Sequence, residues 1–423
     1  MRIFKFGGAS VKDADAVRNI TEVLRQFQGD GLVVVVSAMG KTTNALEKLV
    51  DTWYYKTADP VALLEEIKSF HFNILEALFP DKKHAVYTDI ANTFVELEWI
   101  IEDEAQRDYD FEYDQVVSIG ELLSTRIVSA WLNECGIVNK WKDVRDFLQT
   151  DNTYREGKVD WELTEKLAKQ QLLPFFNDNK DGIVLTQGFI GGTSENFTTT
   201  LGREGSDYTA SIIAFVLDAT CVTIWKDVPG LLNADPKWFD DTIMIDQISY
   251  HDAIELAYYG ASVIHPKTIK PLQNKHIPLY IKSFVQPASK GTMINSFENE
   301  LPVPSFIFKM DQVLISIKPH DFSFIVEENL SDIFRLFAKH KLKINIMQNS
   351  AVSFSVTIDN HQKKIAELVS ELQQNFHVLY NNNLELVTIR HYDQPTIDRL
   401  VNNKEVLLEL KTRNTVQMVV KNL

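Results

Sequence analysis

The sequence predicts an α/β protein with an open, mostly parallel sheet between layers of helices, followed by a smaller α+β module of the ferredoxin-like type. Short apolar strand-like segments alternate with helical patterns over about residues 1–290, which is typical of a sheet covered on both faces. The early strands include a continuous apolar run, as expected for strands buried on both sides. Beyond residue 305 the order of segments changes to βαββαβ, the pattern of small ferredoxin-like units.

Composition limits the function classes. A chain of 423 residues predicts two or three domains. The net charge of −15, with no run of Lys or Arg, disfavours nucleic acid as a partner. Two distant cysteines, Cys135 and Cys221, predict neither a disulfide framework nor a metal site. No apolar run approaches a membrane span and no signal pattern follows Met1, so we expect a cytoplasmic protein without a membrane partner.

The N-terminal region predicts a strand, a glycine turn and a helix. Residues 2–6 alternate as a strand, Gly7 and Gly8 interrupt it, and a helical pattern follows. The apolar face of that helix is formed by Val17, Ile20, Leu24 and Phe27. Residues 31–37 form an apolar, β-branched run that predicts a buried strand, and a second helix begins near Thr43.

Strand and helix patterns continue to alternate in the middle of the chain. Helical periodicity extends to about residue 105, recurs after Gly120 and stops at Gly136. Further strands are predicted at 183–186, 220–226 and 278–282. Ligands of such folds bind at the carboxyl ends of the strands.

The C-terminal module follows a linker-like stretch around Pro302 and Pro304. Its predicted elements are a strand at 313–317, a helix at 330–339, strands at 343–347 and 352–358, a helix at 363–374 and a strand at 384–389. A two-stranded ending is predicted at 406–411 and 415–421. We therefore expect one domain at 1–290 and another at 306–423.

Two early loops could bind phosphate. The segment from Lys5 to Ser10 places a cation beside glycine amides that can approach an anion closely, although a lone lysine there can also be a solvated charge. Residues 37–44 end like a phosphate-binding P-loop, but Val35 stands where that motif needs its first glycine. The sequence therefore excludes a P-loop at this position and leaves open that the loop binds an anion or a substrate as a different structure.

Two further segments place charged residues at helix starts. Glu121 follows Ser118 and Gly120, where a carboxylate is stabilised by the helix dipole or simply serves as a cap. Residues 188–210 combine glycines, the threonines 198–200, Arg203 and Asp207 before another helix. These groups exceed what capping needs, so we favour a functional site there.

The last two segments are less specific. Residues 225–237 form a turn-rich strand exit that could bind a nucleotide or be an ordinary loop. Residues 260–266 join two helices, and His265 in this position is more often structural than catalytic.

Taken in order, the six segments resemble the signature set of the aspartate kinases. The family patterns are KFGG[TS]S, VVSAMG followed by TN, SxGE, GF followed by TTLGRGGSDYTA, WxDVxG and FGAxVxHP, and the matching residues here are collinear. The catalytic resemblance covers residues 1 to about 290, and residues 306–423 resemble the ACT regulatory region of that family.

This resemblance implies the amino acid kinase fold and a defined reaction. Members transfer the γ-phosphoryl group of MgATP to the side-chain carboxylate of L-aspartate, giving 4-phospho-L-aspartate, the first step towards lysine, threonine and methionine. ATP and L-aspartate are then the partners, with Mg²⁺ carried by ATP. A carboxylate with a pKa of about 3.9 needs no general base, so the enzyme must bring two anions together and offset the charge on the transferred oxygens.

The resemblance also implies site residues. Lys5 is expected to contact the transferring phosphoryl group, and Asp207 to orient that lysine. Arg203 is expected to bind the substrate α-carboxylate, Glu121 its ammonium, and Thr43 and Ser206 the remaining oxygens. The implied ATP-binding residues are Lys5, Gly7, Gly8, Ser10, Lys226, Asp227, Leu232, Lys237 and Ser262.

The chain departs from the family pattern at several positions. Ala9 and Glu204 replace a usual Thr and Gly. In the nucleotide segments Lys226, Leu232, Lys237 and Ser262 replace a usual Thr, Tyr, Arg and Lys. These departures keep two alternatives open: a non-catalytic amino-acid-binding homologue, and a kinase of the same fold with another carboxylate substrate.

The regulatory region departs as well. After Ile389 about 34 residues remain, too few for a complete second ACT unit, so a truncated unit is expected. The neutral stretch 345–351 disfavours feedback by lysine and leaves the existence of another amino-acid effector open. Dimerisation or higher homo-oligomerisation through the ACT region is expected.

Overall fold

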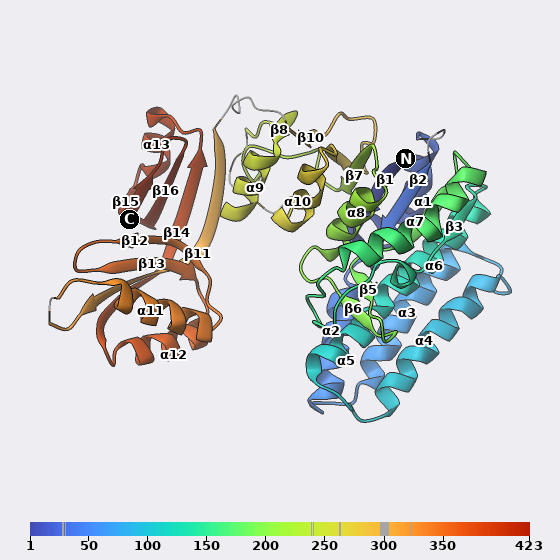
Figure 1. The fold of residues 1–423 in the computed structure, drawn as a ribbon, viewed down its shortest axis with the longest axis horizontal. Coiled ribbons are helices and arrows are strands. Elements are labelled where there is room, and N and C mark those ends of the chain that lie inside the picture. The colour runs from blue at the N-terminus through green and yellow to red at the C-terminus, as the bar shows by residue number, and fades with distance from the viewer. Residues whose placement is uncertain are drawn as a thin grey trace. The chain divides into compact units, whose positions relative to one another are not determined.

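The computed structural model describes residues 1–27, 29, 31–237, 239, 241–261, 264–296, 304–321 and 323–423. The chain divides into two compact units, drawn with their elements labelled in Figure 1. The first unit consists of Met1–Leu231, Met244–Ile254 and Val263–Glu298. The second consists of Leu232–Ile243, Glu255–Ser262 and Asn299–Leu423.

The first unit is built on an eight-stranded sheet with the order β3-β4-β2-β1-β7-β9-β10-β8. Its strands are β1 (Arg2–Phe6), β2 (Leu32–Val36), β3 (Asn139–Trp141), β4 (Ile183–Gln187), β7 (Cys221–Lys226), β8 (Gln247–Ser249), β9 (Leu279–Ser283) and β10 (Thr292–Asn295). Every pairing is parallel except that of β9 with β10. The predicted parallel sheet is confirmed, and β2 is buried along its whole length because both faces are covered.

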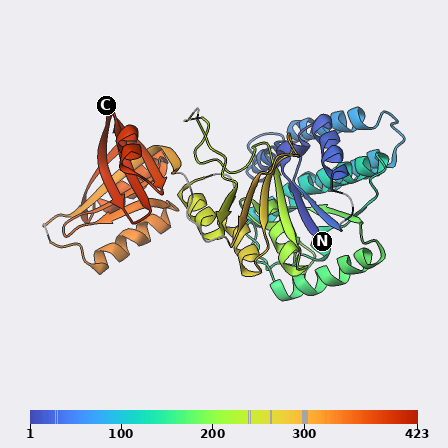
Figure 2. The same ribbon diagram turned by 90° about the horizontal axis from the view of Figure 1, so that it is seen from above.

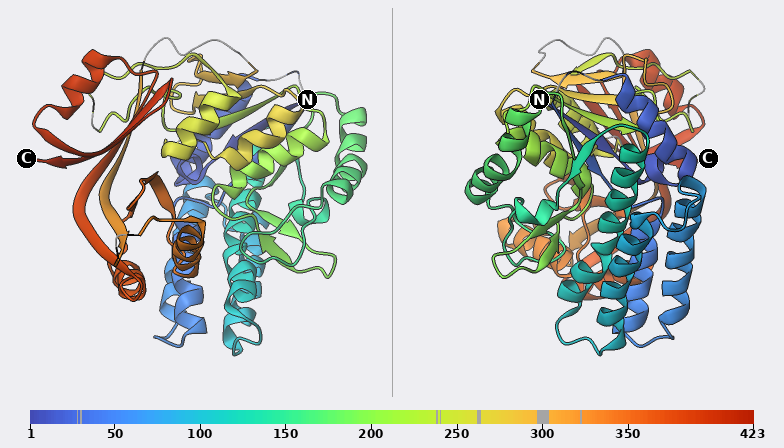
Figure 3. Two further views of the ribbon diagram at one scale, coloured as in Figure 1. Left: turned by 60° about the vertical axis from the view of Figure 1, so that its left-hand side comes forward. Right: turned by 90° about the vertical axis from the view of Figure 1, so that its right-hand side faces the viewer.

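Helices cover both faces of this sheet. The helices of this part of the chain are η1 (Gly8–Val11), α1 (Ala14–Arg25), α2 (Thr42–Tyr54), α3 (Val61–Leu78), α4 (Ala85–Glu102), α5 (Tyr109–Val117), α6 (Ile119–Glu134), η2 (Val144–Asp146), α7 (Trp161–Asp178), α8 (Gly205–Val216), α9 (Tyr250–Tyr259) and α10 (Pro266–Asn274), of which α9 is divided between the two units. Figure 2 shows α7 and α8 on one face and α1 and α6 on the other, in agreement with their contacts. Helices α3 and α4 form a further layer beyond α6 (Figure 3).

A small hairpin completes the first unit. Strands β5 (Ile190–Gly192) and β6 (Thr198–Thr200) pair antiparallel and are fully buried. The hairpin follows β4 directly in sequence and leads into the loop before α8. It therefore joins the carboxyl end of a sheet strand to the start of a helix.

The second unit contains a six-stranded antiparallel sheet with the order β12-β13-β11-β14-β16-β15. Its elements are β11 (Ser305–Pro319), α11 (Glu327–Lys339), β12 (Ile344–Asn349), β13 (Phe354–Asp359), α12 (Gln362–Leu372), β14 (Phe376–Arg390), α13 (Gln394–Val401), β15 (Lys404–Lys411) and β16 (Thr415–Asn422). The predicted order βαββαβ is confirmed. The two C-terminal strands extend the same sheet, and α13 is an element that the sequence analysis does not predict.

Among the described residues, no helix combines the length and the hydrophobicity that crossing a lipid bilayer requires.

Candidate active site

The central strands end in charged residues at one edge of the sheet. Strand β1 lies between β2 and β7, and Lys5 pairs in register with Ile224 of β7. Lys226 is the last residue of β7. Because these strands are parallel, their carboxyl ends meet at the same edge, and Lys5 and Lys226 lie on neighbouring strands there.

A buried ion pair joins this edge to the start of α8. The Lys5 Nζ atom lies 2.6 Å from Oδ1 of Asp207, and the two side chains are only 10% and 3% exposed. Nζ of Lys226 lies 3.6 Å from the other carboxylate oxygen of Asp207. Burial by itself raises the pKa of Asp207, but the charges of Lys5 and Lys226 outweigh it and lower the pKa overall. Asp207 is therefore an ionised carboxylate held between two lysines.

Two loops pack closely beside Lys5. The Gly40 N–H donates to the Gly8 carbonyl over 3.0 Å. A Cβ atom on Gly8 would lie 2.8 Å from the Gly40 oxygen, so the loops could not approach this closely with any other residue at position 8. The Ser10 N–H donates to the Gly7 carbonyl over 2.9 Å, and its hydroxyl is buried. Backbone amides and a hydroxyl thus surround the end of β1.

Glu121 lies in the first turn of α6 and is 2% exposed. Its Oε1 accepts a hydrogen bond from the Ala38 N–H over 3.3 Å, while Oε2 is buried without a hydrogen-bond partner in the described part of the chain. Burial raises the pKa of Glu121 to about 8, against the opposing effects of the Ala38 hydrogen bond and the Lys5 charge. The second oxygen is therefore available to a cationic ligand.

The helix that carries Glu121 packs against α2. A Cβ atom on Gly120 would lie 3.3 Å from the Thr42 methyl group and 3.1 Å from the Ala38 methyl group. Thr43, the next residue of α2, is half-buried. This close packing places the start of α2 beside the start of α6.

The start of α8 is fixed by the end of β4. A Cβ atom on Gly188 would lie 2.5 Å from the Ser206 Cβ, and the Phe189 N–H donates to Oγ1 of Thr209 over 2.9 Å. Ser206 is buried. These contacts hold the residues next to Asp207 directly against the sheet edge.

The loop before α8 presents an exposed arginine. Arg203 is exposed and makes no hydrogen bond or ion pair with any residue that the structure describes. Glu204 caps the helix with φ of 53°, in the left-handed region where glycine is favoured. That conformation explains the glycine usual at this position in the aspartate kinase pattern. One Glu204 oxygen is buried and lacks a hydrogen-bond partner among the described residues.

The residues predicted to bind ATP are distributed over both units. Those that lie in the first unit are Lys5, Gly7, Gly8, Ser10, Lys226 and Asp227. Leu232 and Lys237 belong to the second unit, where the Lys237 N–H donates to the Asp235 side chain over 2.9 Å. Ser262 lies outside the described residues. The first unit by itself therefore gathers the predicted phosphate-side residues.

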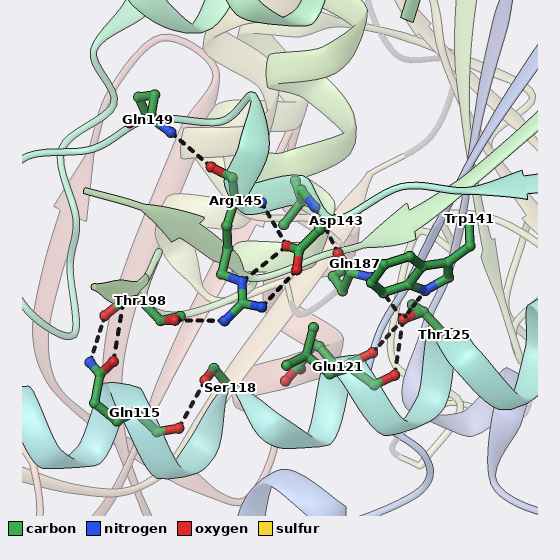
Figure 4. Close-up of polar contacts among 12 residues, drawn as sticks. Gln115, Ser118, Glu121, Thr125, Trp141, Asp143, Arg145, Gln149, Gln187 and Thr198 are labelled. Carbon is green, nitrogen blue, oxygen red and sulfur yellow. Dashed lines mark hydrogen bonds and ion pairs between the residues drawn. The ribbon is translucent and has the colours of Figure 1, made fainter. Parts of the chain in front are cut away.

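A group of polar residues around α5, α6 and β6 is not part of any sequence motif, and Figure 4 shows some of its members. Arg145 pairs with Asp143 and donates to Oγ1 of Thr198 over 3.1 Å. Gln115 bonds to the backbone of Thr198, and Asp114 next to it is fully buried. Polar residues on the buried side of a helix have no local sequence signature, because their partners are distant in the chain.

Comparison with known proteins gives the family. Residues 1–283 match the amino acid kinase family. Lysine-sensitive aspartokinase 3 of Escherichia coli strain K12 is 32% identical over 360 residues, which cover 84% of this chain and 78% of that protein. The chain belongs to the amino acid kinase family, in its aspartokinase branch.

Solved aspartokinase structures agree with this assignment. Aspartokinase III of E. coli in complex with lysine and aspartate has a TM-score of 0.83 and 28% identity, covering 99% of this chain and 95% of that chain. The same enzyme with aspartate and ADP has a TM-score of 0.81 and 28% identity, covering 99% and 96%. The similarity extends over both units, so the second unit also has an aspartokinase counterpart.

Proposed function

We propose that this aspartokinase transfers the γ-phosphoryl group of MgATP to the side-chain carboxylate of L-aspartate. The product is 4-phospho-L-aspartate, which begins the biosynthesis of lysine, threonine and methionine. The observation that carries the proposal is the buried group of Lys5, Asp207 and Lys226 at the end of β1. It provides two positive charges where two negatively charged reactants have to meet.

The residues around the transferred phosphoryl group act by positioning it and by offsetting its charge. Lys5 and Lys226 offset the charge that spreads over the transferred oxygens, and Asp207 holds both ammonium groups in place. Gly7, Gly8 and Ser10 supply backbone and hydroxyl donors to the phosphates. Mg²⁺ would be carried with ATP and would neutralise further phosphate charge.

Different residues bind the ammonium group and the carboxylate groups of the amino-acid substrate. The unpartnered oxygen of Glu121 pairs with the aspartate ammonium, and Arg203 binds the α-carboxylate through its planar guanidinium group. Thr43 and Ser206 bind the remaining oxygens. The side-chain carboxylate is then left to face Lys5 and attack the γ-phosphorus without a general base.

The remaining ATP contacts are assigned to Lys226, Asp227, Leu232, Lys237 and Ser262, with Asp227 and its neighbours through Lys237 on the adenosine side. Four of these residues differ from the usual family residues, and Lys226 brings a positive charge in place of a neutral threonine. Its contact with Asp207 supports a phosphate role for this lysine.

The division into a catalytic and a regulatory region is also part of the proposal. We assign residues 1–290 to catalysis and 306–423 to an ACT region with a truncated second unit, which dimerises the protein in the cytoplasm. E. coli aspartokinase III forms a complex with lysine, but the matching stretch 345–351 is neutral here. We expect lysine at millimolar concentration to leave the rate unchanged; strong inhibition by lysine would contradict this.

An assay of ADP release tests the function. Purified protein is incubated with MgATP and L-aspartate, and in parallel with L-glutamate and other amino acids. Turnover that depends on aspartate supports the proposal. Turnover with another carboxylate would identify a different substrate, and binding of aspartate without any turnover would identify a non-catalytic homologue.

A further inference from the structure

Helix α5 carries a carboxylate that accepts hydrogen bonds from two distant segments. Asp114 is fully buried. Its Oδ2 accepts from the Arg155 N–H over 2.8 Å and from the Thr200 N–H over 2.9 Å. Its Oδ1 accepts from the Thr200 hydroxyl over 2.7 Å. One carboxylate therefore ties the end of β6 and the loop at Arg155 to α5.

The next residue makes a second pair of contacts with the same strand. The Gln115 side-chain amide donates to the Thr198 carbonyl over 2.9 Å, and its oxygen accepts from the Thr198 N–H over 3.2 Å. Thr198 and Thr200 alternate along β6 and so lie on the same side of the strand. Asp114 and Gln115 together form what we call the hairpin latch, since they hold both ends of β6.

The latch lies between two groups assigned to the substrate. Strand β6 ends at Thr200, three residues before Arg203. Helix α5 ends at Val117 and α6 begins at Ile119, with Ser118 as the shared cap, so Glu121 follows the latch within two helical turns. The position of Arg203 relative to Glu121 thus depends on how the hairpin is attached to α5.

Figure 4 shows that Thr198 of the hairpin also contacts Arg145. The Thr198 hydroxyl accepts from Arg145, which forms a bidentate pair with Asp143. Gln187 at the end of β4 connects the same region to α6, because its side chain accepts from the Val144 N–H and donates to the Thr125 hydroxyl. The polar contacts therefore form a continuous frame around the start of α6.

We infer that Asp114, assisted by Gln115, is a positioning residue that sets the geometry of amino-acid binding by fixing the hairpin before Arg203 to the helix that leads to Glu121. This inference rests on the proposed aspartate kinase activity. Asp207 is outside the effect of the latch, because the start of α8 is held separately by Gly188 and by the Phe189–Thr209 hydrogen bond. Loss of the latch should therefore affect substrate binding more than phosphoryl transfer.

The chemistry of the latch distinguishes two substitutions. Asp114→Ala removes both acceptor oxygens and their three hydrogen bonds, and it leaves two backbone N–H groups without these partners in a buried place, so the hairpin shifts. Asp114→Asn keeps an amide oxygen for the two N–H groups, and its NH₂ can donate to the Thr200 hydroxyl oxygen. The asparagine variant should therefore retain most of the geometry.

The test compares steady-state kinetics of the full-length variants. Asp114→Ala is expected to raise the KM for aspartate roughly tenfold to a hundredfold, as displacement of a binding group by about 1 Å does. Its kcat and its KM for ATP should stay within about twofold of wild type, and Asp114→Asn should restore most of the aspartate KM. Gln115→Ala should show a smaller change in the same direction.

A matched control lies on the same helix. Glu112 is also buried and accepts two backbone N–H bonds, from Gln106 at 3.1 Å and Arg107 at 3.0 Å, but it holds a loop that does not lead to the site. Glu112→Ala should lower the unfolding temperature and leave the aspartate KM unchanged. An equal rise in aspartate KM for Glu112→Ala and Asp114→Ala would show a general loss of packing and overturn the inference.

The outcomes separate this inference from the proposed function. Absence of aspartate-dependent ADP release in the wild-type protein overturns the proposed function itself. An active wild type whose Asp114→Ala variant keeps its aspartate KM overturns the inference alone. If Asp114→Ala fails to fold, the aspartate KM of Gln115→Ala tests the inference instead, since this variant leaves the buried carboxylate intact. An unchanged KM in Gln115→Ala would then overturn the inference.

Discussion

Two buried carboxylates near the end of β1 have pKa values shifted in opposite directions. Burial raises the pKa of Glu121 to about 8, and one of its oxygens has no hydrogen-bond partner among the described residues. Asp207 is buried as deeply, but Lys5 and Lys226 lower its pKa. The same residue class therefore serves two purposes: Asp207 stays charged to hold cations, and Glu121 becomes charged when a cation arrives.

This difference predicts how aspartate binding depends on pH. The ammonium group of aspartate pairs with ionised Glu121, so the dissociation constant should fall as pH rises from 6 towards about 8 and level off above it. Titration calorimetry at several pH values measures this. Glu121→Gln should bind aspartate more weakly and with little pH dependence over the same range; an unchanged pH profile in that variant would contradict the assignment.

Stability without ligand should show the reverse trend. The folded-state pKa of Glu121 is raised above its ordinary value of 4.5, so the folded protein retains a proton that the unfolded chain has lost. Its contribution to stability therefore falls as pH rises from 4.5 to about 8. The Glu121→Gln variant should lack this part of the pH dependence.

Lys5 and Arg203 should fail in different ways when replaced. Lys5→Ala should abolish phosphoryl transfer and largely keep aspartate binding, because its charge acts on the transferred phosphoryl group. Arg203→Ala should weaken aspartate binding itself, by about 1.5–3 kcal/mol for a lost charged hydrogen bond. Rate measurements and direct binding of aspartate separate the two effects.

The same two variants should also differ in their free energy of unfolding. Lys5→Ala also leaves the buried Asp207 with one lysine fewer, which should lower the free energy of unfolding by a few kcal/mol. Arg203 is exposed, so its replacement should leave stability nearly unchanged. Equal loss of binding and of transfer in both variants would contradict the separate roles.

At the scale of elements, the site depends on the close approach of β4 and α8. Gly188→Ala would place a methyl group 2.5 Å from Cβ of Ser206. We expect a loss of stability of about 1–3 kcal/mol as the helix start moves away. We also expect a fall in kcat of up to about a hundredfold, because Asp207 moves with it. Chemical denaturation and steady-state kinetics measure the two effects.

Gly136 offers the control for this prediction. It has a positive φ of 77°, but an added Cβ there would meet no atom within 4 Å. Gly136→Ala should therefore cost about 1 kcal/mol of stability through backbone strain and leave kcat unchanged. A Gly188→Ala variant with normal kcat would show that the strand–helix contact is not required for catalysis.

Most elements follow from local sequence pattern, and the exceptions have a physical cause. The buried strands β1, β2, β4, β7 and β9 are predicted because continuous or alternating apolar residues indicate their burial. The short strands β3, β8 and β10 are not predicted, since three or four residues carry too little periodicity. Helix α13 is not predicted either, because it is short, has a proline as its second residue and contains a single buried residue, Ile397.

At the scale of the molecule, two short segments in the middle of the chain belong to the second unit. Phe306 donates its N–H to the Asn233 carbonyl over 2.7 Å, and Ala234 packs in one apolar cluster with Val387 and Ile389. Arg390 forms an ion pair with Glu255. The second unit is therefore assembled from three parts of the sequence.

This arrangement predicts the result of truncation. A chain that ends at residue 298 loses the partners of 232–243 and 255–262, which exposes apolar surface and removes the Arg390 side chain that pairs with Glu255. We expect the truncated chain to unfold at a lower temperature than the full chain, as measured by calorimetry. We also expect it to aggregate, as measured by light scattering. Co-expression with residues 299–423 should reverse both changes; a truncated chain as stable as the whole would contradict this division.

The sequence by itself determined the fold class, the order of the main elements and the residues available for the chemistry. Apolar periodicity and glycine turns depend on near neighbours, so they can be read along the chain. Only the tertiary structure decided that Lys226 shares Asp207 with Lys5, that Glu121 keeps an unpartnered oxygen, and that Asp114 holds the β6 hairpin. These contacts join residues far apart in sequence, and they exist because packing brings several strand ends and helix starts to one edge of the sheet.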